Sequence, residues 1–74
     1  MSSFVHSIYS DSAFGVPVDL EGAGTPLENP YVYDSAAREL KTLAEQGLVR
    51  IVDEQWRSGF AEPLIGRIRF ERLR

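Results

Sequence analysis

Residues 34–73 constrain the fold most, because a helical pattern in this segment ends at a glycine and runs directly into two strand-like patterns. The helix and the strands each have an apolar side that must be buried against another element. The segment therefore predicts a helix over 34–46 and an antiparallel β-hairpin over 48–73. We expect one α+β domain, residues 1–74, in which one helix packs on a small antiparallel sheet.

The predicted helix has a capping residue at each end. Asp34 can accept hydrogen bonds from the free amides of the first turn, and its charge suits the positive end of the helix dipole. Gly47 can take the left-handed conformation that ends a helix, and Leu48 then occupies the position from which a Schellman motif contacts Leu43. Apolar residues recur between the two ends at helical spacing, which predicts a packed face made of Ala37, Leu40, Leu43 and Ala44. This face should lie on strand residues that include Ile51, Ile68 and Phe70.

Charge predicts the register of the hairpin. Pairing Trp56 with Ile65 places opposite charges face to face, whereas a register in which Arg50 faces Arg69 is unfavourable. The favoured register predicts the pairs Glu54 with Arg67, Arg50 with Glu71, Leu48 with Leu73 and Ile51 with Phe70. The hairpin arginines can then serve as cross-strand ion pairs or as the basic face of a nucleic-acid-binding module.

The N-terminal part predicts one more strand and a long loop. Residues 4–9 are rich in β-branched and aromatic side chains, which is typical of a strand. Residues 10–33 contain three glycines and three prolines, a composition that excludes a helix of ordinary length. Residues 16–20 can form a brief edge strand within this loop. Loops of this length in small domains tend to be binding surfaces or partly disordered.

The net charge of −3 is unevenly distributed along the chain. Residues 1–36 contain five acidic residues and neither lysine nor arginine, whereas residues 50–74 contain six arginines. A duplex-binding domain usually has a clearly basic face and often a basic overall charge. The acidic N-terminal part suits a basic protein partner instead.

The sequence contains no pattern of a catalytic, metal or cofactor site. His6 is the only histidine, and no serine or carboxylate partner is predicted beside it. The chain has no cysteine, which excludes disulfides and thiolate metal ligands and suits a reducing compartment. No apolar run approaches a membrane span, and the N-terminus lacks the features of a signal peptide. We expect no enzyme activity, no cofactor, no membrane association and a cytoplasmic location.

Part of the chain resembles a known DNA-binding family. The run Leu-Lys-Thr-Leu-Ala-Glu-Gln-Gly-Leu-Val-Arg over 40–50 and the run Ile-Gly-Arg-Ile-Arg-Phe over 65–70 are similar to the second half of a winged helix-turn-helix domain. In that family the corresponding helix is the recognition helix and the hairpin is the wing. The resemblance implies a DNA-binding transcriptional regulator, whose DNA-facing residues by position would be Arg38, Lys41, Thr42, Gln46 and Arg57.

The function that we favour is that of a small non-enzymatic interaction protein. It would be an inhibitor or adaptor of the phage or mobile-element type, such as the anti-CRISPR proteins, and would bind a basic, nucleic-acid-handling protein. Acidic groups without basic neighbours would steer the partner, and aromatic side chains would anchor it. The predicted partner-binding residues are Asp11, Asp19, Glu21, Glu28, Tyr31 and Phe60. Phe60 belongs to the predicted hairpin tip, where its side chain either anchors a partner or folds back on the sheet. The DNA-binding regulator is the alternative, and either protein could form a homodimer.

Overall fold

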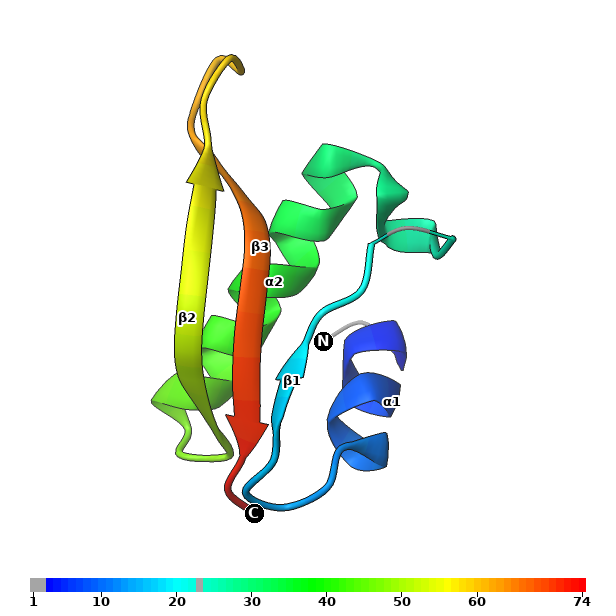
Figure 1. Cartoon of the computed structure of the whole chain (residues 1–74), viewed down its shortest axis with the longest axis vertical. Coiled ribbons are helices and arrows are strands. Elements are labelled where there is room, and N and C mark those ends of the chain that lie inside the picture. The colour runs from blue at the N-terminus through cyan, green and yellow to red at the C-terminus, as the bar shows by residue number, and fades with distance from the viewer. Residues whose placement is uncertain (1–2, 23) are drawn as a thin grey trace.

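The computed structural model describes residues 3–22 and 24–74 and shows a three-stranded antiparallel sheet with two α-helices (Figure 1). The α+β class predicted from the sequence is confirmed. The strands lie side by side in the order β1-β3-β2. No helix in the described part of the chain is both long and apolar enough to cross a membrane. The elements follow one another as α1 (Ser3–Asp11), β1 (Pro17–Asp19), the 3₁₀ helix η1 (Pro26–Glu28), α2 (Pro30–Glu45), β2 (Val49–Arg57) and β3 (Leu64–Arg72).

The core lies between α2 and the sheet, with α2 crossing one face and α1 beside β1 (Figure 1). Leu40 of α2 and Phe70 of β3 are both 0% exposed. The predicted packing of the helix on the sheet is confirmed. The core cluster draws on every helix, on β2 and β3 and on the residue after β1, through Val5, Leu20, Leu27, Tyr33, Ala36, Ala37, Leu40, Leu43, Val49, Ile65, Ile68 and Phe70.

α1 replaces the strand that was predicted over residues 4–9. Val5 is fully buried, and Ile8 and Tyr9 pack against the same core. These three residues follow one another at the i, i+3, i+4 spacing of one helix face, so the helical conformation buries all of them together. Packing against the rest of the chain therefore overrides their preference for strands.

α2 begins four residues before the predicted cap. The side chain of Asn29 accepts hydrogen bonds from the amides of Tyr31 and Val32, and Pro30 occupies the first turn, where a missing N–H costs nothing. The prediction that Asp34 caps the helix is wrong, because Asp34 lies inside α2 and is buried. Pro26 and Pro30 of the predicted loop thus begin helices instead of preventing them.

The C-terminal end of α2 is the predicted Schellman motif. Gly47 has a φ of 76°, in the left-handed region. Its N–H donates to the carbonyl of Ala44, and the N–H of Leu48 donates to the carbonyl of Leu43, both at 3.0 Å. Leu48 packs against the core.

The predicted hairpin register is confirmed at both ends of the ladder and shifted by one residue in its middle. Arg50 faces Glu71, and Trp56 faces Ile65. Between these pairs, β2 and then β3 each contain one extra residue, so Glu54 faces Ile68 and not Arg67. The register of the N-terminal strand β1 is Pro17 with Glu71, Val18 with Phe70 and Asp19 with Arg69, which confirms the brief edge strand that was predicted within 16–20.

Candidate functional site

Three of the six predicted partner-binding residues line one groove between α1 and β1. The groove has a volume of about 400 Å³. Its lining includes apolar side chains from both elements and from the segment between them, among them Ile8, Val16 and Val18. Its acidic lining consists of Asp11 at the end of α1, Asp19 at the end of β1, and Glu21. We call this site the acidic groove.

The three carboxylates of the acidic groove differ in their pairing. Asp19 accepts two hydrogen bonds from Arg69, both at 3.0 Å, and a third from Arg67 at 3.4 Å. The hydrogen bond from Arg69 is the largest cause that lowers the pKa of Asp19. The expectation that Asp19 has no basic neighbour is therefore wrong. Asp11 and Glu21 are exposed and form no salt bridge with any residue in 3–22 or 24–74, so their charges remain uncompensated.

Tyr31 and Phe60, which were predicted as separate anchors, contact each other. Their ring centroids are 5.5 Å apart at an angle of 77°, an edge-to-face arrangement. Tyr31 is 59% exposed, and Phe60 is half-buried. Phe60 thus packs on the first turn of α2. The guanidinium of Arg57 lies 5.8 Å from the centre of the Phe60 ring.

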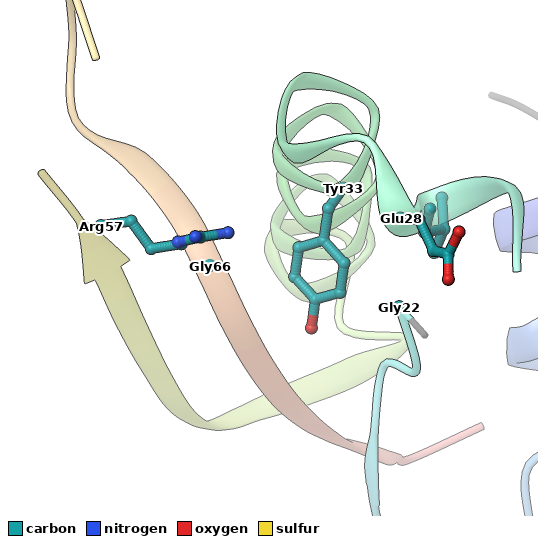
Figure 2. A pocket seen from close by; sticks show the side chains of 6 residues that line it. Gly22, Glu28, Tyr33, Arg57 and Gly66 are labelled. Atoms are coloured by element: carbon teal, nitrogen blue, oxygen red, sulfur yellow. The ribbon is translucent and has the colours of Figure 1, made fainter. Parts of the chain in front are cut away.

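Glu28 lines a second cavity of about 490 Å³, where β3 lies opposite η1 and α2 (Figure 2). The other polar side chains of this cavity are those of Arg57 and Tyr33, and Gly22 and Gly66 line it as well. Figure 2 shows the Arg57 side chain crossing β3 at Gly66 and pointing toward Tyr33. We call this site the Arg57 cavity. Sequence reasoning missed Tyr33 and Gly66, because only the folded chain brings them beside Arg57.

The hydroxyl of Tyr33 is fully used within the fold. It donates to the carbonyl of Leu20 at 2.7 Å and accepts from the N–H of Ile68 at 3.1 Å. Burial raises the pKa of Tyr33 above its usual value. The ring of Tyr33 therefore lines the cavity, whereas its hydroxyl is engaged in the hydrogen bonds to Leu20 and β3.

The two cations predicted for DNA contact on α2 are both paired with carboxylates. Arg38 donates to Asp34 at 2.8 Å, and Lys41 donates to Glu54 at 3.0 Å. Both cations also lie over the Trp56 ring, 5.6 and 5.5 Å from its centre. Their charges are therefore compensated and their positions fixed by the hairpin.

The remaining residues predicted for DNA contact do not add a basic surface. Thr42 on α2 and Gln46 at the C-cap of this helix are exposed, and the hydroxyl of Thr42 donates to the carbonyl of Arg38. Arg57 is exposed and has no salt bridge to a described residue. Of the three cations predicted for DNA contact, Arg57 is the one without a carboxylate partner among the described residues.

The arginines on the sheet favour the ion-pair alternative. Arg50 and Glu71 are joined at 2.7 Å, as the register predicted. The predicted pair of Glu54 with Arg67 does not form, and Arg67 and Arg69 instead bind Asp19 on β1. The sheet therefore carries both signs of charge on neighbouring strands.

Residues 3–22 and 24–74 contain no group of three or more histidine or acidic side chains that could hold a metal ion. The exposed ring of His6 is 6.3 Å from the ring of Tyr9, measured between centroids. Comparison of the chain with models of protein families, with curated proteins and with solved structures finds no match.

Proposed function

We propose that this protein is a non-enzymatic inhibitor or adaptor that binds a basic segment of a nucleic-acid-handling protein in the acidic groove. The observation that carries the proposal is the meeting of Asp11, Asp19 and Glu21 around an apolar lining. A basic segment with an apolar side chain would satisfy both features, because apolar contact supplies affinity and opposite charge supplies orientation and a fast approach.

The negative charge of the acidic groove supports a protein partner over a nucleic acid. Asp11 and Glu21 would repel phosphate groups, and the chain as a whole has a net charge of −3. A small acidic protein of this type is comparable, by analogy of size, charge and partner class, with the inhibitors of phages and mobile elements such as anti-CRISPR proteins. Its partner would be met in the cytoplasm.

The proposal can be tested by capturing a partner from host lysate and measuring binding kinetics for charge-reversed variants. Asp11→Lys with Glu21→Lys removes the uncompensated charges of the groove and leaves the paired Asp19 in place. We expect this double variant to slow association, and salt to reduce the difference from the unaltered protein.

The matched control is Glu45→Lys with Glu62→Lys, two exposed residues that do not line the groove and whose reversal changes the net charge equally. It should slow association much less than the groove variant does. If both double variants slow association equally, net charge alone is responsible and the groove is not the binding site.

The order of the elements favours a second candidate, a DNA-binding regulator. A winged helix places helices before its recognition helix, and here α1 and η1 precede α2. The β2–β3 hairpin follows α2 directly, at the place of the wing. A gel shift with generic duplex DNA at low salt separates the two candidates, because only the regulator would retard the duplex.

A further inference from the structure

We propose that the Arg57 cavity (Figure 2) binds a short zwitterionic peptide, whose carboxylate lies against Arg57 and whose ammonium group lies against Glu28. This site goes beyond the proposed function, because the Arg57 cavity and the acidic groove share no described lining residue. Its volume of about 490 Å³ is within the range of roughly 300–1,000 Å³ that is typical of small-ligand sites.

Gly66 allows Arg57 to reach the cavity. A Cβ atom at position 66 would lie 2.2 Å from both Cγ and Cδ of Arg57, so any other residue would displace the arginine. The φ of Gly66 is not in the positive region, so the backbone conformation does not require glycine there. The role of this glycine is therefore to leave room for the arginine stem across β3.

Arg57 and Glu28 carry opposite charges into one cavity without pairing with each other. Arg57 is held beside the Phe60 ring, and one oxygen of Glu28 accepts a hydrogen bond from the N–H of Gly24 at 2.8 Å. Neither residue forms a salt bridge within the described parts of the chain. Each charge is thus positioned by its own neighbours and remains available to a ligand.

The combination of charges selects the class of ligand. A simple anion would be attracted by Arg57 and repelled by Glu28. A simple cation would be attracted by Glu28 and repelled by Arg57. A zwitterion satisfies both groups, because guanidinium pairs well with carboxylate and a carboxylate accepts from ammonium. Leu27 and the ring of Tyr33 also line the cavity and offer apolar contact to short side chains between the two ends.

The test is an NMR titration of the isotope-labelled protein with trialanine at neutral pH. We expect saturable shifts of the Arg57 side-chain Nε–H and of the Gly24 and Gly66 amides. N-acetyl-trialanine and trialanine amide each lack one charge, and each should bind at least about tenfold more weakly, as expected for a lost charge-assisted hydrogen bond. If either blocked peptide binds as tightly as trialanine, or if inorganic phosphate produces the same shifts, the proposal is overturned.

Variants test the two ends separately. Arg57→Gln and Glu28→Gln should each weaken trialanine binding about tenfold. Gly66→Ala keeps both charges but displaces the arginine stem, and it should weaken binding to a similar extent. Arg50→Gln, in the same strand but outside the cavity, should bind like the unaltered protein.

Unchanged binding by folded Gly66→Ala would overturn the positioning of Arg57. Should Gly66→Ala fail to fold, the two glutamine variants decide, and unchanged binding by either of them overturns the site. Failure of the peptide site would not contradict the proposed function of the acidic groove. The two are tested separately, because Asp11→Lys with Glu21→Lys alters no lining residue of the Arg57 cavity.

Discussion

The carboxylate of Asp34 in α2 accepts a hydrogen bond from the backbone N–H of Ile65 in β3 at 2.8 Å. The preceding helical residue, Tyr33, accepts from the N–H of Ile68 in the same way. Both amides lie beyond residues 69–71, with which β1 pairs. Two consecutive side chains of α2 therefore complete the hydrogen bonding of β3 where β1 does not reach, and they fix the helix on the sheet.

Removal of the Asp34 carboxylate should destabilise the fold. Asp34→Ala leaves the Ile65 N–H without its acceptor, and we expect the free energy of unfolding to fall by about 1–3 kcal/mol. Asp34→Asn retains an acceptor oxygen and should cost less. Ser35→Ala, at the exposed neighbouring position, should change stability by no more than about 0.5 kcal/mol. Urea denaturation measures all three, and equal effects of Asp34→Ala and Ser35→Ala would show that the hydrogen bond contributes nothing.

Acid should weaken the fold through Asp34 and Asp19. Burial raises the pKa of Asp34, but the hydrogen bonds from Arg38 and Ile65 and the charge of Arg38 outweigh it, so the net pKa is lowered. The hydrogen bond from Arg69 likewise lowers the pKa of Asp19.

A carboxyl whose pKa is lower in the folded state stabilises the fold above its unfolded pKa of about 3.9, and this stabilisation is lost as the pH falls through the folded value. Urea denaturation at a series of pH values should therefore show stability decreasing below about pH 4. Asp34→Asn should make this decrease shallower. An equally steep decrease in the variant would mean that Asp34 does not titrate with folding.

The parts of the fold that local rules control were predictable from the sequence. Gly47 ends α2 through contacts within a few residues, and the charges of Arg50 and Glu71 align the ends of the hairpin. The middle of the hairpin was not predictable, because cross-strand charge pairing takes no account of the contacts that α2 makes with the strands. Glu54, for example, pairs with Lys41 of α2 instead of the cross-strand Arg67.

α1 and the sites were only partly predictable for the same reason. The residues of α1 prefer strands locally, but a helix forms because it buries Val5 against the core. Asp11 and Glu21 could be recognised as uncompensated charges, but their meeting in one groove depends on α1 lying beside β1. The crossing of Arg57 over Gly66 occurs at the extra residue of β3, which charge pairing alone does not predict.

Truncation of the core should test the packing of α2. Leu40→Ala removes a fully buried side chain and should lower the free energy of unfolding by about 2–5 kcal/mol, a large part of the stability of so small a domain. Ile68→Val should cost about 0.5–1.5 kcal/mol and gives a measurable result if Leu40→Ala fails to fold. Val32→Ala, at a position that is 43% exposed, is the control. An unmoved thermal midpoint for Leu40→Ala would show that Leu40 is not in the core.

Duplex DNA should not bind measurably at physiological salt. The charges of Arg38 and Lys41 are compensated by carboxylates, so few phosphates would be neutralised and no retardation of the duplex is expected. If the protein is instead the DNA-binding regulator, Arg38→Glu with Lys41→Glu should abolish the retardation seen in a gel shift, and the affinity should fall steeply as salt rises. A tight, specific complex with duplex DNA at physiological salt would favour the DNA-binding regulator over the interaction protein.

Arg72 holds α1 against the C-terminal strand. Its guanidinium lies 4.7 Å from the centre of the Tyr9 ring and 4.4 Å from that of Phe14, and it donates to the carbonyls of Ser10 and Ser12 at 2.9 and 3.2 Å. These carbonyls are at the C-terminal end of α1, where a positive charge is favourable. The planar guanidinium can stack on the rings while its edge donates hydrogen bonds, whereas an ammonium group has no flat face to stack.

Arg72→Lys should therefore loosen α1 although it keeps the charge. We expect a loss of about 1–2 kcal/mol in the free energy of unfolding, from the ring contacts and the hydrogen bonds together. Amide hydrogen exchange should rise more in α1 than in β2, because α1 loses its attachment while β2 keeps its pairing with β3. Arg50→Lys, on the exposed surface of β2, serves as the matched control and should leave α1 protected. If Arg72→Lys raises exchange equally in α1 and β2, the effect is global and Arg72 does not hold α1 specifically.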